Sequence, residues 1–130
     1  MKPTALFVYG TLLDGQSAGG MLGGMARRPA VLTGRLWVLP AGYPVLVDDD
    51  PEPLTIRGEL VELASPGVLM VVDLYEGGAD SLYHRVEAAA RAEGRAIACW
   101  VYRSSRSEAS RAGGRRLAID DWRLVAPRPV

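Results

Sequence analysis

Short apolar runs, separated by turn residues, occupy most of the chain. Residues 6–9 read Leu-Phe-Val-Tyr and are stopped by Gly10, which predicts a buried strand that ends in a turn. Turn chemistry at 41–44 and at Glu93-Gly94 predicts two more reversals of the chain. Further strands are predicted at 33–39, 45–47, 56–63, 83–90 and 97–102.

One stretch has the periodicity of an amphipathic helix. Its apolar residues recur at helical spacing, as Val68, Val71, Val72 and Tyr75. Ser65 is expected to cap this helix, Pro66 to occupy its first position and Gly77-Gly78 to end it. A looser helix is expected within 14–24, although its glycines weaken the helical tendency.

The last third of the chain contains a polar stretch. Residues 103–116 carry five arginines and one glutamate, and we expect them to form a flexible loop. Apolar residues return at 117–125, including Trp122. Because no repeat or linker interrupts the pattern, residues 1–130 are expected to form a single domain.

Composition narrows the function classes. The 130 residues include 15 basic and 15 acidic side chains, whereas nucleic-acid binding usually shows a basic excess. One cysteine allows no internal disulfide, and one histidine argues against a zinc cluster. The longest apolar run, 68–72, is far too short to span a membrane. We therefore expect a cytoplasmic protein without nucleic-acid or membrane partners.

The turn after the first predicted strand is a candidate anion site. Tyr9-Gly10-Thr11-Leu12 places consecutive backbone N–H groups at a bend, where they can bind a carboxylate or phosphate. The turn lacks the Gly-Lys-Ser/Thr of a P-loop. The alternative is a tight turn that needs glycine only for its backbone angles.

Glu76 is the candidate general acid and base. It follows Val72 by four residues and Val68 by eight, so it extends the apolar stripe of the helix toward the core. Burial and the helix C-terminus both disfavour the carboxylate and raise its pKa, as a base working near neutral pH requires. The alternative is a frayed helix end with Glu76 in water. Asp73 falls off the stripe and is expected to be solvated.

Tyr83-His84-Arg85 is a second candidate group. On a strand, Tyr83 and Arg85 point to one face and His84 to the other. Facing Glu76, the tyrosine and the arginine would suit an anionic substrate. A close Arg85 would lower the pKa of Glu76, so we expect Arg85 at a distance or paired elsewhere. His84 lacks a second histidine or an evident Ser-Asp partner and is predicted to be structural or on the surface.

Three further features favour structural interpretations. The acidic stretch Asp48-Asp49-Asp50 with Glu52 lacks the ligand spacing of a calcium loop and is predicted to be solvated. Cys99 lies in an apolar strand without a nearby activating charge, which predicts a buried and inert thiol. The arginine-rich segment 103–116 could contact an anionic partner, but a solvated loop is the expectation.

Eight short motifs follow one another along the chain. They are Val8-Tyr9-Gly10-Thr11-Leu12, Gly34-Arg35-Leu36, Gly42-Tyr43-Pro44, Gly58-Glu59-Leu60, Asp73-Leu74-Tyr75-Glu76-Gly77, Tyr83-His84-Arg85-Val86, Trp100-Val101-Tyr102 and Ile119-Asp120-Asp121-Trp122. In this order the chain resembles the γ-glutamylcyclotransferase-like family, particularly its short bacterial and γ-glutamylamine-cyclotransferase-type members. The closing motif departs from the family, which usually has glycine where Asp120 stands, so the shape of the closing turn is open.

The resemblance implies a fold and a reaction. The fold is α+β, a small mixed β-barrel of about five to seven strands with one or two outer helices, in which Glu76 and the 9–12 turn share a cavity. In the reaction, the α-amine of a γ-glutamyl amide attacks its own γ-carbonyl, 5-oxoproline forms and the amine leaves. No metal or cofactor is required. The implied residues are Glu76 as general acid/base and, for substrate binding, Tyr9, Gly10, Thr11, Leu12, Tyr83 and Arg85.

Two other functions stay open at this level. The same barrel could bind a small carboxylated ligand without turnover, since a fold does not fix a function. An interaction domain that uses the 103–116 segment would instead bind polyanions in a salt-dependent way. The leaving amine is also open: glutathione-derived peptides, γ-glutamyl amino acids, γ-glutamyl-ε-lysine and other γ-glutamyl metabolites all fit. The oligomeric state cannot be read from the sequence.

Overall fold

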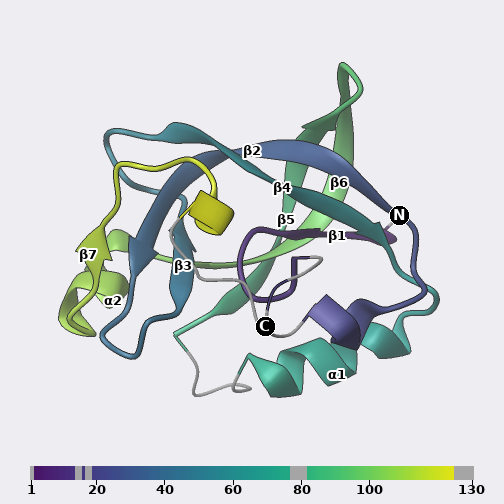
Figure 1. The fold of residues 1–130 in the computed structure, drawn as a ribbon, viewed down its shortest axis with the longest axis horizontal. Coiled ribbons are helices and arrows are strands. Elements are labelled where there is room, and N and C mark those ends of the chain that lie inside the picture. Colours follow the sequence, from purple (N-terminus) through teal and green to yellow (C-terminus); the bar gives the residue numbers. More distant parts are fainter. Residues whose placement is uncertain (1, 14–15, 17–18, 77–81, 125–130) are drawn as a thin grey trace.

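The computed structural model describes residues 2–13, 16, 19–76 and 82–124, which form one twisted sheet with helices outside it (Figure 1). Two α-helices are present in these ranges, α1 (Gly67–Tyr75) and α2 (Arg106–Arg111), with 3₁₀ turns at Gly19–Leu22 and Trp122–Leu124. None of these helices is long and apolar enough to cross a membrane. The strands are β1 (Ala5–Val8), β2 (Arg27–Val38), β3 (Pro44–Val47), β4 (Leu54–Glu62), β5 (His84–Ala92), β6 (Arg95–Ser104) and β7 (Arg115–Arg116).

Five of the strands close into a barrel in the order β1-β4-β2-β3-β6, with β6 returning to β1. The β1–β6 and β3–β6 pairs are parallel and the others antiparallel, so the barrel is mixed. β5 forms a hairpin with β6, and β7 pairs with β2. Closure leaves few unpaired strand edges, which is how small β proteins avoid edge-to-edge association. The expected α+β barrel is confirmed.

The length of β2 makes this closure possible. Residues 27–34 pair with β4, and residues 35–38 pair with β3, so one strand serves two sides of the barrel. The sequence predicts this strand only from Thr33, because Arg27-Arg28-Pro29 shows no apolar pattern. Its first half is fixed by backbone pairing instead.

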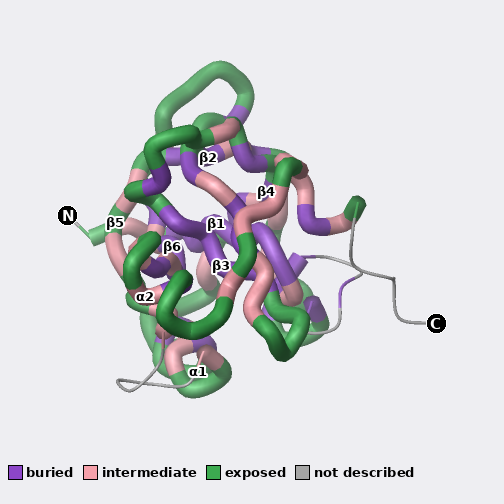
Figure 2. The backbone as a smooth tube through the Cα atoms, turned by 90° about the vertical axis from the view of Figure 1, so that its left-hand side faces the viewer, coloured by how far each residue is buried: buried purple, intermediate pink, exposed green. Residues whose placement is uncertain are grey.

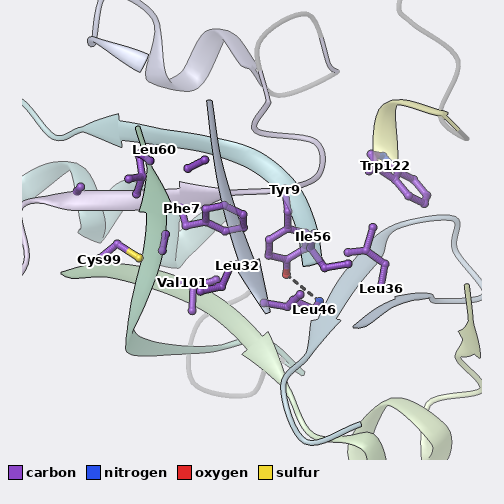
Figure 3. Close-up of a cluster of buried hydrophobic side chains, with 14 residues drawn as sticks. Phe7, Tyr9, Leu32, Leu36, Leu46, Ile56, Leu60, Cys99, Val101 and Trp122 are labelled. Carbon is purple, nitrogen blue, oxygen red and sulfur yellow. Dashed lines mark hydrogen bonds between the residues drawn. The ribbon is translucent and has the colours of Figure 1, made fainter. Parts of the chain in front are cut away.

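The barrel interior is an apolar core. Phe7, Ile56 and Leu60 point into it, and Cys99 lies among them (Figure 3). All four residues of β1 are buried because Phe7 faces this interior while Leu6 and Val8 belong to a second cluster that includes Val72 of α1. The helix is therefore packed against the outside of β1. This packing brings the end of α1 close to the end of β1.

Helix α1 lies where the apolar periodicity places it, but its start differs from the expectation. It begins at Gly67 after Pro66, and no side chain caps it. Ser65 contributes its backbone carbonyl, which accepts the Val68 N–H at 3.2 Å, so the prediction of a Ser65 side-chain cap is wrong. Gly77-Gly78 lie outside the described residues. Of the expected helix at 14–24, the described part is the 3₁₀ turn Gly19–Leu22.

The prediction of a loop over 103–116 is wrong. This segment contains the end of β6, the helix α2 and strand β7. Ser105 begins α2 by accepting the Glu108 N–H on its Oγ at 3.0 Å, and the Glu108 carboxylate in turn accepts the Ser105 hydroxyl at 3.2 Å. This Ser-x-x-Glu arrangement is characteristic of a helix start, and it is visible in the sequence.

The acidic stretch at 48–52 is bound by this same arginine-rich segment. Asp50 is buried, and its carboxylate accepts hydrogen bonds from Trp37 Nε1 and Arg116 Nε, both at 3.0 Å. Asp48 pairs with Arg103, and the Arg106 N–H donates to Asp49 at 2.7 Å. The expectation of a solvated acidic loop is therefore wrong for Asp50, whereas Asp48, Asp49 and Glu52 are exposed as expected. The arginine partners of Asp48, Asp49 and Asp50 lie 55 to 66 residues away along the chain.

The closing motif forms a turn of its own. The Asp121 carboxylate accepts the Arg123 N–H at 3.0 Å and forms a two-point ion pair with the Arg123 side chain. The Asp120 carbonyl accepts the Arg57 N–H at 2.7 Å, which ties the turn to β4. Trp122 is thereby buried against the core (Figure 3). With aspartate at position 120, the closing turn is thus joined to β4 by a backbone hydrogen bond.

Candidate active site

A cavity of about 270 Å³ opens beside the end of β1. It is bounded by the turn after β1, the turn between β2 and β3 and the end of α1. Tyr83, just before β5, and Tyr102, within β6, complete the wall. Glu76 and the 9–12 turn both line it, as the resemblance implied. The lining residues are Phe7, Val8, Tyr9, Gly10, Thr11, Leu12, Leu39, Tyr43, Pro44, Tyr75, Glu76, Tyr83 and Tyr102.

The turn after β1 contributes Tyr9, Gly10, Thr11 and Leu12 to the cavity lining. Within the described residues the Leu13 N–H donates to the Gly10 carbonyl at 3.0 Å, and this bond uses none of the amides of residues 10–12. Gly10 is also required sterically, since a Cβ there would lie 2.6 Å from Cγ of Pro44. Consecutive amides at a bend are suited to a carboxylate.

Glu76 stands at the C-terminal end of α1, where its N–H donates to the Val72 carbonyl at 2.9 Å. Its side chain is half-buried in the cavity wall. Burial disfavours the carboxylate and raises the pKa of Glu76 from 4.5 to about 7. A carboxyl in this range exchanges protons readily near neutral pH.

Tyrosines form much of the remaining wall. The Tyr9 hydroxyl donates to the Tyr102 carbonyl at 2.6 Å and accepts the Leu46 N–H at 3.1 Å (Figure 3), so Tyr9 shapes the cavity. The Tyr83 hydroxyl donates to the Pro44 carbonyl at 2.7 Å. Burial raises the pKa of Tyr9 and of Tyr83, and the charge of Glu76 raises both further. Both phenols therefore stay protonated near Glu76.

Arg85 is paired with a carboxylate other than that of Glu76. Its Nε lies 3.2 Å from Oδ1 of Asp73, and its guanidinium lies 4.7 Å from the ring centre of Trp100. The prediction that Arg85 pairs elsewhere is confirmed, and Arg85 is outside the lining set. Asp73 is not the solvated residue that the helical stripe predicts, because it also accepts the Tyr102 hydroxyl. Burial and this hydrogen bond raise the pKa of Tyr102.

The other titratable candidates lie outside the cavity. His84 is exposed as predicted, and its Nε2 lies 2.7 Å from Oε2 of Glu108 on α2, a partner that the sequence does not reveal. Burial raises the pKa of the Cys99 thiol to about 11, in agreement with an inert cysteine. Within the described ranges, no group of three or more His, Cys, Asp or Glu side chains could hold a metal ion.

Several lining residues are not predicted from the sequence pattern. The motif of Tyr43 and Pro44 predicts only a turn, and that of Tyr102 predicts only a strand. Periodicity places Tyr75 on the buried stripe of α1, but its hydroxyl lies 2.7 Å from Oγ1 of Thr11 at the cavity. A signal was present in the sequence, since these tyrosines fall within the motifs that carry the family resemblance.

Comparisons with known proteins agree with this architecture. The model of the family described as "Gamma-glutamyl cyclotransferase, AIG2-like" matches residues 6–124. YkqA from Bacillus subtilis superposes with a TM-score of 0.72 at 22% identity, over 93% of this chain and 40% of that one. An AIG2-like protein from Mus musculus gives 0.68 at 21%, over 99% and 87% of the two chains.

A structure described as a gamma-glutamyl cyclotransferase gives a TM-score of 0.61 at 15% identity, over 85% of this chain and 80% of that chain. At these identities the superpositions establish a common fold. A comparison with curated proteins finds no match. The family model nonetheless spans the 9–12 turn, Glu76 and every strand of the barrel except the first residue of β1. The chain therefore belongs to the gamma-glutamyl cyclotransferase, AIG2-like family.

Proposed function

We propose that the protein is an enzyme that cyclises a γ-glutamyl amide to 5-oxoproline and releases the amine. The observation that supports this most directly is the position of Glu76. Its half-buried carboxyl, with a pKa of about 7, shares a cavity of about 270 Å³ with the residues of the 10–12 turn. The cavity thus offers a proton acceptor and an anion site to one small substrate.

The proposed binding mode uses the backbone first. The amides of Gly10, Thr11 and Leu12 hold the α-carboxylate of the glutamyl group, and its α-ammonium then faces Glu76. The cavity is small beside sites for drug-sized ligands, which measure roughly 300–1,000 Å³. It therefore accommodates the glutamyl group and leaves the amine at the mouth.

The chemistry then needs proton transfer and proximity. Glu76 takes a proton from the α-ammonium, and the freed nitrogen attacks the γ-carbonyl carbon, which a folded substrate brings to about 3–3.5 Å. The bond to the leaving nitrogen breaks as Glu76 returns the proton to it. Over the whole reaction two protons leave the α-nitrogen and two reach the amine, so no water is consumed. Asp73 supports this role by keeping Arg85 from lowering the pKa of Glu76.

The test is a panel of γ-glutamyl compounds assayed for 5-oxoproline and free amine. We expect equal amounts of both products from the native protein and a fall of about 10²- to 10⁴-fold in kcat/KM for Glu76→Gln. Glu87→Gln, an exposed carboxyl on β5, is the matched control. Full turnover by a folded Glu76→Gln variant contradicts the assignment, and saturable binding without product indicates the binding module instead.

A second pair of variants tests the anion site. Thr11→Pro removes one backbone N–H donor from the turn, whereas Thr11→Val removes only the hydroxyl that meets Tyr75. We expect KM to rise more in the proline variant than in the valine variant. Equal KM values in two variants with native circular dichroism spectra contradict the role of the amide.

A further inference from the structure

Arg27 joins distant parts of the chain behind the turn that follows β1. Its Nη1 donates to the Leu12 carbonyl at 3.0 Å and to Oε1 of Glu59 at 2.9 Å. Its Nη2 donates to the Gly19 carbonyl at 2.9 Å. The side chains of Arg27 and Glu59 are only 13% and 15% exposed. One guanidinium thus ties the end of the 9–12 turn, and the 3₁₀ turn that begins at Gly19, to the barrel.

The barrel holds this arginine in place. Arg27 begins β2 and pairs with Val61 of β4, and Glu59 lies two residues along β4 on the same face of the sheet. Figure 2 shows that β2 and β4 are mostly buried or intermediate. Removal of a guanidinium and a carboxylate from water is costly, and several well-placed hydrogen bonds are needed to offset that cost. Two of the bonds of Arg27 go to backbone carbonyls, so this cost is linked to the shape of the loop.

The cavity itself offers no cationic side chain to a bound carboxylate. Among the described lining residues Glu76 is charged, and no lysine, arginine or histidine is present. Arg85, on a neighbouring strand, is paired with Asp73. Within the described residues, Arg27 is the cation that hydrogen-bonds to the 9–12 turn. Any positive charge that assists this turn from the protein side therefore comes from behind it.

Two peptide groups connect Arg27 with the amide of Thr11. The Leu12 carbonyl, which accepts from Arg27, shares its peptide group with the Leu13 N–H. The Leu13 N–H donates to the Gly10 carbonyl at 3.0 Å, and that carbonyl shares its peptide group with the Thr11 N–H. Hydrogen bonds arranged head to tail polarise one another, and a charged donor at the start strengthens the first of them. The charge of Arg27 thus makes the Thr11 N–H a stronger donor.

We propose that Arg27 is a positioning residue for carboxylate binding, because it holds the 9–12 turn in shape and polarises the Thr11 N–H. This inference rests on the proposed function, in which the turn holds the α-carboxylate of the glutamyl group. Arg27 is outside the lining set and acts through the two peptide groups. Its effect therefore depends on the charge of the ligand and is separate from proton transfer by Glu76.

The experiment compares two ligands that differ only in the carboxylate. 5-Oxoproline, the proposed product, carries it, and 5-oxoprolinamide has an uncharged carboxamide in its place. NMR titration gives the dissociation constant of each ligand, and we call the ratio of amide to acid constants the carboxylate selectivity. We expect this selectivity to fall about tenfold in Arg27→Met, the low end for a hydrogen bond to a charged group, because Arg27 acts through intervening peptides. With a γ-glutamyl substrate, KM should rise while kcat stays close to its native value.

Three variants control for folding and for charge. Arg27→Met removes one partner of the partly buried Glu59 carboxylate, so the double variant Arg27→Met/Glu59→Gln carries the comparison if the single variant does not fold. Glu59→Gln alone keeps the bonds from Arg27 to Leu12 and Gly19, and its carboxylate selectivity should not fall below the native value. Arg28→Met removes a positive charge from the other face of β2 and should leave the selectivity unchanged.

The possible results separate the inference from the function on which it rests. Native selectivity in a folded variant that lacks Arg27 overturns its role and leaves the cyclisation standing. An equal loss of affinity for both ligands indicates a structural role alone and also overturns it. If the native protein binds neither ligand, or both equally well, the inference is wrong even where γ-glutamyl compounds yield 5-oxoproline. If none of these compounds is converted, the cyclisation is refuted, while a fall in selectivity without Arg27 still supports the carboxylate site.

Discussion

Replacement of Glu76 by glutamine makes the energetic cost of this carboxyl measurable without any substrate. Burial raises the pKa of Glu76 from 4.5 to about 7 in the folded protein. In the unfolded chain the carboxyl is solvated and titrates near its ordinary value. Between these two values the folded protein holds a proton that the unfolded chain has lost. The free energy of unfolding therefore falls as pH rises through this interval and is level above it.

The magnitude follows from the two values. At about 1.4 kcal/mol per pH unit, the ionised Glu76 costs up to about 3 kcal/mol above pH 7.5, and less than about 1 kcal/mol at pH 5. Glutamine has a similar shape and does not titrate. The difference in unfolding free energy between Glu76→Gln and the native protein should therefore grow by about 2.5 kcal/mol in favour of the variant from pH 5 to pH 8.

Urea denaturation at several pH values measures this difference. Glu87→Gln, on the exposed side of β5, should follow the native protein at every pH. In a cyclisation assay, kcat/KM should decrease as the pH is lowered through about 7, because the free enzyme needs the Glu76 carboxylate as its base. We call this decrease the acid limb of the pH profile. Parallel stability curves for Glu76→Gln and the native protein would refute the reasoning, since they would show that folding does not desolvate this carboxyl.

Three further predictions concern the Asp73–Arg85 pair, the start of α2 and the buried cysteine. Asp73→Asn releases Arg85 and should move the acid limb of kcat/KM to lower pH, and adding Arg85→Met should restore it; an unmoved limb in the single variant contradicts the sequestering role. Ser105→Ala removes the cap of α2 and should cost about 1 kcal/mol in urea denaturation, whereas Ser107→Ala should cost little. Cys99 should resist alkylation at pH 8 until the protein unfolds; fast labelling of the native state would contradict its burial.

Much of the fold could be read from local patterns. The strands at Leu6 and at residues 97–102, the hairpin turn at Glu93-Gly94 and the apolar stripe of α1 all depend on neighbours within a few positions. Glu93 and Gly94 both adopt positive φ, as a two-residue hairpin requires. The first half of β2 could not be found in this way, because its arginines and proline are held by pairing with β4.

The charged segments show the limit of local reading most clearly. Both the acidic stretch at 48–52 and the arginine-rich stretch at 103–116 look like solvated loops when each is considered alone. In the folded protein the buried Asp50 carboxylate accepts hydrogen bonds from Trp37 and Arg116. The acidic segment thus supplies the carboxylate, and the arginine-rich segment supplies the guanidinium that pairs with it. Burial of a charge is tolerated only with such a partner, and the partner is 66 residues away.

The sequence by itself determined which residue types are available at the candidate site. Helical periodicity shows which side chains face the core, and it places the acidic residue Glu76 at the end of the apolar stripe. The glycine after the first strand indicates a turn with consecutive backbone N–H groups. The tertiary structure decided which of these groups come together. The fold places Glu76 and the Gly10 turn in the wall of one cavity, and it pairs Arg85 with Asp73. These arrangements depend on contacts between segments that are distant in the sequence. The pKa of a carboxyl is shifted by burial and by the charges near it in space, so its position along the chain does not reveal that pKa.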